Sequence, residues 1–255
     1  MQVVAHRGAS EENAEHTLGA YLKALEAGAD GLECDVRLTA DGHLVCVHDR
    51  NLRRTGSNRG VVSTMELKEL HELDVATWKN PWADLDDEAP DVDPELGRVL
   101  TLRKLLETVA DCGRPVDMAI ETKHPTRYGG LVERRLVQLL GEFGWTGADS
   151  PARVMSFSFT ALQRVHRLAP GLPLVVLVEK AHHWPMLRRL VQPDWIIGPG
   201  IKELRDHPGL GRHLGGRRVH VWTVNTDEDL ALCQDLGVEA VITDRPAYML
   251  ERLGR

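Results

Sequence analysis

Aromatic residues and long hydrophobic runs are scarce in this sequence. Phe, Trp and Tyr together make up 5% of its 255 residues, so aliphatic side chains must fill most of a core. The longest apolar run, residues 174–178, is much shorter than the ~20 residues that span a bilayer. The N-terminus also lacks the basic and apolar regions of a secretory signal. We therefore expect neither a transmembrane segment nor an export signal.

Cysteine is rare and follows no pattern. The four cysteines are scattered along the chain, with no C-x-x-C pair and no spacing typical of metal ligands. Three of them lie in or beside apolar runs, which is typical of small core residues. This usage fits a reducing compartment, and we expect a cytoplasmic protein.

Basic residues are outnumbered by acidic ones. Lys and Arg total 31 against 38 Asp and Glu, which gives a formal net charge of -7 at pH 7. Because phosphate backbones select basic surfaces, we expect no nucleic-acid partner. A small phosphorylated substrate is compatible with this charge, since it responds to the groups around its own site. The sequence carries no signal for an oligomeric state.

Short apolar runs alternate with helical patterns along the chain, which implies parallel strands joined by crossover helices. Eight strand–helix units remain when residues 44–47 are treated as a hairpin or an extension of the second strand. Eight units favour a closed TIM (β/α)8 barrel. The predicted strands are 3–5, 31–36, 44–47, 116–120, 154–157, 174–178, 194–197, 219–224 and 240–242. The predicted helices are 17–27, 65–73, 102–110, 131–142, 160–168, 184–191, 227–235 and 248–253, with another within 202–214.

One stretch interrupts this repeat. Residues 49–100 contain only one clear helical pattern, together with Trp78, Trp82 and an acidic segment at 84–95. We expect one domain over residues 1–255, with 49–100 as an insertion after the second strand. Long insertions in barrels usually lie over the C-terminal face and serve the active site. The acidic segment is expected to be a solvated loop, with a second cation site as the alternative.

The first chemical signal is His6-Arg7-Gly8, directly after the first predicted strand. Barrel active sites lie at the C-terminal ends of the strands, so both side chains are candidates. Arg7 could bind phosphate through its planar guanidinium, and His6 could transfer a proton near neutral pH. The alternative for His6 is a local hydrogen bond at the end of the strand.

Paired carboxylates give the second signal. Glu33 and Asp35 are two residues apart in a predicted strand and therefore share one face. Two neighbouring carboxylates need a cation, a proton or an arginine between them, and oxygen ligands suit a divalent ion such as Mg²⁺ or Ca²⁺. The alternative is that Arg7 or Lys123 neutralises them without a metal.

Three further positions follow predicted strands. His48 ends the apolar run next to the carboxylate strand, and Glu121 and Lys123 share a face after another strand. Together they would add a proton-transfer group, a third carboxylate and a second cation. Trp222 follows a later strand, where it could either wall a small-molecule pocket or belong to the core.

An ordered set of motifs resembles a known family. Together the motifs extend from residue 6 to residue 246, in the order found in glycerophosphodiester phosphodiesterases. They are His6-Arg7-Gly8, Glu15-His16-Thr17, Glu33-Cys34-Asp35-Val36, His48-Asp49, Glu121-Thr122-Lys123, Trp222-Thr223-Val224-Asn225 and Thr243-Asp244-Arg245-Pro246.

The resemblance implies a TIM barrel that hydrolyses glycerophosphodiesters to glycerol 3-phosphate and an alcohol. It implies one divalent cation, which could be Mg²⁺, Ca²⁺ or Mn²⁺. The carboxylates that would bind this cation are Glu33, Asp35 and Glu121. Glu15 would support the site through a hydrogen bond or the outer shell of the metal.

The resemblance also assigns the remaining candidates. His6 and His48 would form the general acid–base pair, and Arg7 and Lys123 would hold the substrate phosphate. The nucleophile would be water or the glycerol 2-hydroxyl of the substrate.

The resemblance is incomplete at one position. The family usually has Pro-Glu-Asn-Thr where this chain has Ala14-Glu15-His16-Thr17, so His16 replaces the usual Asn. Thr17 is expected to be the N-cap of the first helix. We expect Asp244 to cap the last helix, with Pro246 near its first turn.

Three alternative functions are compatible with a phosphate-binding barrel. The first is a lysophospholipase-D-type enzyme whose Trp78 and Trp82 face lipid. The second is an isomerase or aldolase, although such enzymes lack this set of histidines and carboxylates. The third is a binding barrel without activity, which is disfavoured because His6, His48 and the carboxylates are all present.

Overall fold

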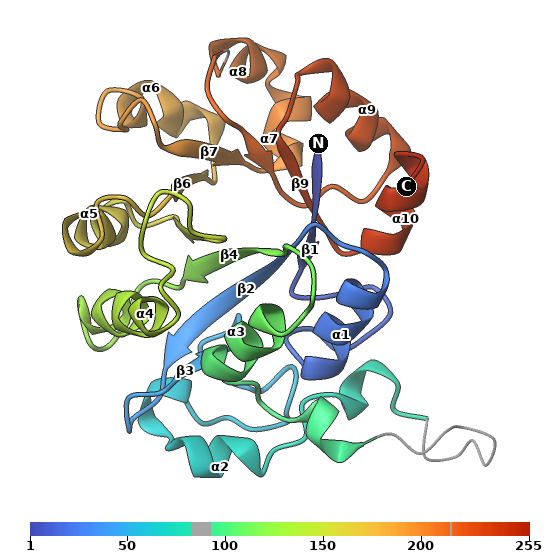
Figure 1. Cartoon of the computed structure of the whole chain (residues 1–255), viewed down its shortest axis with the longest axis vertical. Helices are drawn as coiled ribbons and strands as arrows, with labels where there is room; N and C mark the ends of the chain where they lie inside the picture. Colours follow the sequence, from blue (N-terminus) through green and yellow to red (C-terminus); the bar gives the residue numbers. More distant parts are fainter. Residues whose placement is uncertain (83–92, 215) are drawn as a thin grey trace.

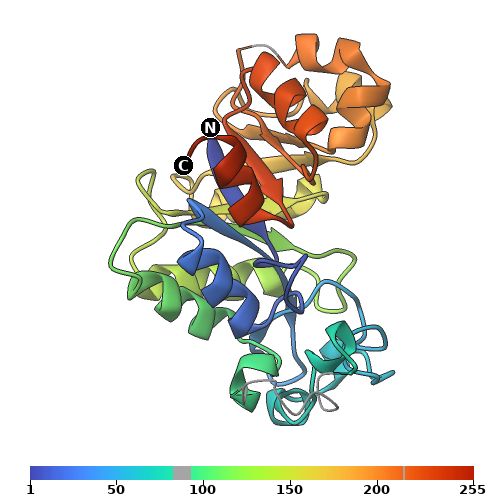
Figure 2. The same ribbon diagram turned by 90° about the vertical axis from the view of Figure 1, so that its right-hand side faces the viewer.

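A computed structural model describes residues 1–82, 93–214 and 216–255. Over these residues, eight parallel strands form the barrel that the sequence predicts, with helices around its outside (Figures 1 and 2). The strands follow the order β7-β6-β5-β4-β2-β1-β9-β8. They are β1 Gln2–His6, β2 Gly31–Leu38, β4 Asp117–Thr122, β5 Ala152–Ser156, β6 Leu174–Val178, β7 Ile196–Pro199, β8 His220–Val221 and β9 Ala240–Thr243.

The ring of strands is nearly closed between β7 and β8. Parallel bridges join Ile197 to Val219 and Gly200 to Trp222, so the last strand in the order lies beside the first. One further strand, β3 (Leu44–Cys46), pairs antiparallel with β2 and lies outside the ring. This confirms residues 44–47 as a hairpin extension of the second strand.

The helices cover the outer face of the barrel, and the first of them begins where the sequence predicts. Thr17 caps α1 as predicted, since its hydroxyl accepts a hydrogen bond from the backbone amide of Ala20. The helices are α1 Leu18–Glu26, α2 Leu67–His71, α3 Leu102–Ala110, α4 Leu131–Glu142, α5 Phe159–Leu168, α6 Trp184–Leu187, α7 Ile201–Asp206, α8 Pro208–His213, α9 Asp227–Asp235 and α10 Pro246–Arg252.

Two predicted helices differ from the structure. The helix expected at 184–191 is the single turn α6. The helix expected within 202–214 is divided into α7 and α8 at Pro208. Proline restricts the residue before it and has no amide to donate, so the chain ends one helix and begins the next there.

The barrel interior holds a small apolar core of its own. Its members are Val4, Ala119, Met155, Val175, Leu177, Ile196, Ala240 and Ile242, with Trp222 packed against it. A larger core fills the space between the strands and the surrounding helices.

The described part of the 49–100 segment forms a small layer beside β3 and α1 (Figure 1). It contains α2 and the 3-10 helices η1 (Val62–Thr64), η2 (Thr77–Lys79) and η4 (Pro94–Gly97). A third apolar cluster, which includes Leu52, Leu70 and Val75, packs it against the β3 hairpin. Most of the acidic segment predicted as a solvated loop, residues 84–92, lies outside the described residues.

No helix in the described ranges has both the length and the apolar character needed to cross a membrane.

Candidate active site

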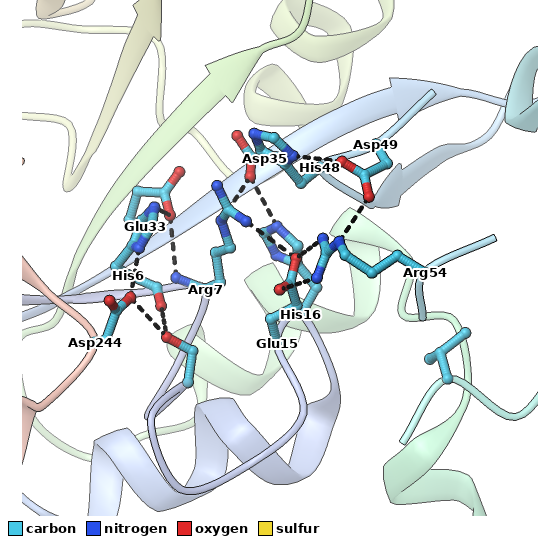
Figure 3. A network of polar contacts seen from close by, with 12 residues as sticks. His6, Arg7, Glu15, His16, Glu33, Asp35, His48, Asp49, Arg54 and Asp244 are labelled. Atoms are coloured by element: carbon cyan, nitrogen blue, oxygen red, sulfur yellow. Dashed lines mark hydrogen bonds and ion pairs between the residues drawn. The ribbon is translucent and has the colours of Figure 1, made fainter. Parts of the chain in front are cut away.

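The C-terminal ends of neighbouring strands bring the predicted site residues together (Figure 3). His6 ends β1, directly opposite Glu33 of β2 in the strand register. Asp35 of β2 is in turn opposite Glu121 of β4. Because adjacent parallel strands align these positions, residues from three separate motifs face one mouth of the barrel.

Three buried carboxylates form the centre of this site. One oxygen each from Glu33, Asp35 and Glu121 lies within 4.8 Å of the others. Burial, together with the Asp35 carboxylate, raises the pKa of Glu33 well above its usual range and that of Glu121 to about 8. Burial also opposes ionisation of Asp35, but the hydrogen bond from His16 and the nearby cations bring its pKa well below the usual range. Asp35 is therefore the carboxylate that stays charged.

Two basic side chains contact this carboxylate cluster. Lys123 Nζ lies 2.8 Å from Glu121 Oε1 and 3.2 Å from Asp35 Oδ1. Arg7 Nε lies 3.1 Å from Asp35 Oδ2, and the backbone amide of Arg7 donates to Glu33 Oε2 at 3.1 Å. The sequence left open whether Arg7 or Lys123 would pair with these carboxylates, and the structure shows that both do.

The donor set fits a divalent cation. Arg7 and Lys123 supply two positive charges against three carboxylates, so full ionisation leaves the cluster one negative charge in excess. The candidate ligand atoms are all carboxylate oxygens, which is the ligand chemistry that Mg²⁺, Ca²⁺ and Mn²⁺ prefer. Burial and the neighbouring Asp35 carboxylate raise the pKa values of Glu33 and Glu121, and a bound cation would favour their ionised forms.

His6 is oriented by a carboxylate that the sequence analysis assigned elsewhere. Its Nδ1 lies 2.7 Å from Asp244 Oδ1, which also accepts from Ser10 Oγ at 2.9 Å. Asn225 Nδ2 donates to the other oxygen of Asp244 at 2.7 Å. Burial opposes ionisation of Asp244, but the hydrogen bonds from His6, Asn225 and Ser10 lower its pKa to about 2.

The prediction that Asp244 caps the last helix is therefore wrong. Arg245 occupies the cap position of α10, and no side chain caps that helix end. Ala5 of β1 is opposite Thr243 of β9, so the next residue on each strand, His6 and Asp244, are neighbours in the closed barrel. This register is the signal that could have revealed the pair.

His48 has an equivalent partner, the adjacent residue in the chain. Its Nδ1 lies 2.8 Å from Asp49 Oδ1. Burial lowers the pKa of His48, although Asp35 partly opposes this shift. Arg54 Nε donates to the second oxygen of Asp49 at 2.8 Å, which ties this histidine to the inserted segment.

Glu15 links the two sides of the site through hydrogen bonds, the first of the two roles expected for it. Arg54 binds Glu15 with both terminal nitrogens, each at 2.7 Å, and Arg7 Nη1 donates to Glu15 Oε1 at 3.0 Å. Burial opposes ionisation of Glu15, but the two arginines lower its pKa to about 2. Arg54 was not identified from the sequence, because nothing local marks it among the other arginines of the segment.

Trp222 lies at the end of the barrel core. Its Nε1 donates to the backbone carbonyl of Gly198 at 2.8 Å, and its ring meets that of Phe157 edge-on with 5.5 Å between centroids. The ring packs on the interior apolar cluster, as the core alternative predicts, while remaining partly accessible. The pocket-wall role of Trp222 remains a prediction.

Comparisons with known proteins point to one family. The sequence model of the Glycerophosphoryl diester phosphodiesterase family matches residues 6–248. The chain is 44% identical over 250 residues to a Mycobacterium tuberculosis protein named probable glycerophosphodiester phosphodiesterase 1, covering 96% of this chain and 89% of that protein. It is 33% identical over 254 residues to a glycerophosphodiester phosphodiesterase of Bacillus subtilis, covering 95% and 83%.

Solved structures share the fold. A phosphodiesterase from Oleispira antarctica, in complex with the product sn-glycerol-3-phosphate, superposes with a TM-score of 0.81 at 23% identity, covering 100% of this chain and 97% of that one. A glycerophosphodiester phosphodiesterase from Agrobacterium tumefaciens gives 0.73 at 26% identity, covering 97% of both. Because the family model spans nearly the whole chain, this chain belongs to the glycerophosphoryl diester phosphodiesterase family.

Proposed function

We propose that this chain hydrolyses glycerophosphodiesters to glycerol 3-phosphate and an alcohol, with one divalent cation and with His6 and His48 as the acid–base pair. The observation that carries the proposal is the matched pair of contacts His6–Asp244 and His48–Asp49, both beside the carboxylates of β2 (Figure 3). The names of the M. tuberculosis and B. subtilis relatives support the same substrate class.

The two histidine–carboxylate contacts determine which ring nitrogen is available. An ionised carboxylate only accepts hydrogen bonds, so Nδ1 carries a proton in both His6 and His48. In the neutral ring, Nε2 is then the free base. His6 Nε2 lies 3.9 Å from Glu33 Oε2, which places it beside the carboxylate cluster.

The residues that would hold the cation are Glu33, Asp35 and Glu121, and the ion would be Mg²⁺, Ca²⁺ or Mn²⁺. When bound, such an ion supplies positive charge that offsets the growing charge on a phosphoryl oxygen. Arg7 and Lys123 lie against the same carboxylates and would bind the substrate phosphate beside it. Glu15 and Asp35 hold the Arg7 guanidinium in place, so the phosphate meets a preorganised donor.

The histidines would divide the two proton transfers. Burial lowers the pKa of His48, which keeps its ring neutral at pH 7 and suits it to remove a proton from the nucleophile. His6, acting as the imidazolium with a proton on Nε2 as well, would then protonate the leaving alkoxide. The nucleophile is water or the glycerol 2-hydroxyl of the substrate, and the second option would give a cyclic product before hydrolysis.

A second substrate class, lysophospholipids, is favoured by one observation. Trp82 is 71% exposed in the inserted segment, and the Trp78 ring lies near its surface. Lys79 of the same segment donates to the backbone carbonyl of Ser10 in the β1–α1 loop, so this segment contacts the active-site loops.

We propose that residues 49–100 form an insertion of a single 1–255 domain that borders the substrate.

The central experiment measures release of glycerol 3-phosphate from glycerophosphocholine. Treatment with EDTA should abolish turnover, and addition of Mg²⁺, Ca²⁺ or Mn²⁺ should restore it and identify the ion. His6→Ala and His48→Ala should each lower kcat by roughly 100-fold or more, while the exposed control His43→Ala should not. Full activity after chelation, or wild-type turnover by both histidine variants, would overturn the mechanism.

A parallel assay compares soluble glycerophosphodiesters with lysophosphatidylcholine. A higher kcat/KM for the lipid would favour the second substrate class.

The free thiols Cys34, Cys46, Cys112 and Cys233 support our proposal of a cytoplasmic location.

A further inference from the structure

His16 is a buried side chain that the proposed reaction does not use. It is 4% exposed, and its Nε2 lies 2.9 Å from Asp35 Oδ2. Its Nδ1 lies 2.8 Å from the hydroxyl of Tyr21, which is fully buried in α1. The imidazole lies against a carboxylate of the candidate cation site (Figure 3) and connects it to Tyr21 of the first helix.

Tyr21 reaches the same strand at a second point. Its hydroxyl lies 3.1 Å from the backbone carbonyl oxygen of Glu33. The single proton of this hydroxyl can be donated either to the Glu33 carbonyl or to Nδ1 of His16, whose Nε2 faces Asp35. One buried hydroxyl thus lies against the backbone of Glu33 and is linked to the side chain of Asp35 through His16. A movement of this hydroxyl would be transmitted to two of the three carboxylate-bearing residues.

The backbone holds His16 in this place independently of its side chain. His16 has a φ of 61°, in the left-handed region that residues with a Cβ rarely adopt. Its amide donates to the backbone carbonyl of Arg7 at 3.0 Å, and Arg7 itself has a φ of 59°. Arg7 and His16, joined by this backbone hydrogen bond, both have uncommon conformations. These conformations direct the imidazole at Asp35 and the guanidinium at Glu15 and Asp35.

The contacts on Asp35 are divided between its two oxygens. Oδ2 faces His16 and the Nε of Arg7, whereas Oδ1 faces Lys123, which also contacts Glu121. A carboxylate oxygen has two acceptor sites. His16 and Arg7 therefore use the acceptor sites of Oδ2. Oδ1 keeps a second acceptor site beside the one that faces Lys123, on the side of Glu121.

The length of the side chain explains why histidine stands here. The two ring nitrogens lie on opposite sides of the imidazole, so one side chain reaches Asp35 and Tyr21 together. In asparagine, the residue usual in sequences that this chain resembles, the amide ends where Nδ1 of histidine stands and cannot make both contacts.

We propose that His16 is a positioning residue that fixes the rotamer of Asp35 from the Tyr21 hydroxyl and thereby sets the cation affinity of this site. The inference rests on the proposed cation site formed by Glu33, Asp35 and Glu121. Groups that orient metal-binding carboxylates typically change metal affinity 10- to 100-fold when they are removed. The effect should therefore be seen in binding of the metal alone, without turnover.

The test is calorimetric titration of the metal-free protein with Mg²⁺, Ca²⁺ and Mn²⁺. His16→Ala should weaken the affinity for the preferred ion about tenfold or more. His16→Gln, whose amide nitrogen reaches the position of Nε2, should restore most of it, and His16→Asn should not. The exposed histidine variant His43→Ala is the matched control and should bind as the wild type does.

Tyr21→Phe tests the other end of the contact with little change in volume. It should weaken cation binding in the same direction as His16→Ala but less. In the His16→Ala background it should have a smaller further effect, because the path to Asp35 is already broken and only the contact with the Glu33 carbonyl remains to be lost. Thermal midpoints measured in EDTA report the stability of each variant separately from its affinity.

The outcomes separate this inference from the proposed function. If wild-type protein binds no divalent cation, the cation site itself is wrong and this inference falls with it. If wild-type protein binds a cation and His16→Ala binds it equally well, the cation site stands and only the role of His16 is overturned. Equal weakening by His16→Gln and His16→Asn would likewise reject positioning through Nε2.

Discussion

His6 and Asp244 are 238 residues apart in the sequence, and 2.7 Å separates Nδ1 of the histidine from Oδ1 of the aspartate. The contact exists because β1 and β9 are adjacent in the barrel, with Ala5 opposite Thr243. Closure of the barrel thus creates a histidine–carboxylate pair from the first and last strands of the chain. The pair determines the tautomer of His6 and holds its Nε2 beside Glu33.

Replacement of Asp244 by asparagine should lower kcat by about 100-fold. The Asn amide can donate to Nδ1, which would move the ring proton to Nε2 and remove the group that exchanges protons with the substrate. The measurement is steady-state kinetics with glycerophosphocholine, beside the exposed control Asp235→Asn. Unchanged kcat in Asp244→Asn would show that His6 acts without this partner.

Replacement of Arg54 tests the link between the inserted segment and the site. Arg54→Met removes the bidentate contact with Glu15 and the contact with Asp49, so both His48 and Arg7 lose support. We expect kcat/KM to fall about tenfold. Arg54→Lys should recover little, because a lysine cannot make the paired contacts of a guanidinium. The adjacent exposed Arg53→Met is the control, and an equal loss there would argue against a specific role for Arg54.

The barrel was predictable because its signals are local and repeated. The run at β6 agrees with the structure residue for residue, since five apolar residues between turns leave one choice. Thr17 identified the start of α1 through its capping hydroxyl. The prediction was weaker where neighbouring elements decide the outcome. The strand expected at 219–224 is reduced to β8 at His220–Val221, and Trp222 beyond it forms an isolated bridge with Gly200, just after β7.

The candidate site was predictable only for side chains that the strand pattern itself positions. Glu33 and Asp35 share a face by the two-residue repeat, and Glu121 follows in the neighbouring strand by register. The roles of Asp244 and Arg54 depend instead on which distant segments meet. Asp244 precedes a proline at a helix start, so the local pattern favoured capping, and only the closed barrel reveals its contact with His6.

Cation binding should release protons, and its affinity should rise with pH up to about pH 8. Burial, together with the Asp35 carboxylate, raises the pKa of Glu33 and brings that of Glu121 to about 8, so the cluster holds a proton at pH 7 without an ion. An incoming cation must displace this proton. Calorimetry in two buffers of different ionisation enthalpy measures the release. An affinity that is independent of pH between 6 and 8 would contradict the assignment of these carboxylates.

The variant Glu121→Gln is the control for that experiment. It keeps the size of the side chain but removes both the charge and the titrating group. We expect weaker cation binding together with less proton release at pH 7. Unchanged proton release in Glu121→Gln would place the proton on another group.

His220 should make the stability of the barrel sensitive to mild acid. It lies in β8, is fully buried, and its Nε2 is 3.8 Å from Glu239 Oε2. Burial lowers the pKa of His220 from 6.5 to about 4. The unfolded chain therefore binds a proton at this residue between pH 6.5 and 4 that the folded chain does not. Because the unfolded state binds more protons in this window, the free energy of unfolding falls as the pH falls through it, by up to about 3 kcal/mol.

Urea unfolding at a series of pH values from 7 to 4 tests this contribution. His220→Phe keeps a ring of similar size without a titrating group, so its free energy of unfolding should vary less with pH than that of the wild type. The buried His16 and the half-buried His48 also have lowered pKa values, and the difference between variant and wild type removes their contribution. The carboxylates held at low pKa, such as Asp244, lose their stabilisation mainly below the unfolded carboxylate pKa of about 4. Parallel pH profiles for wild type and His220→Phe would show that His220 is protonated as readily in the folded barrel as in the unfolded chain.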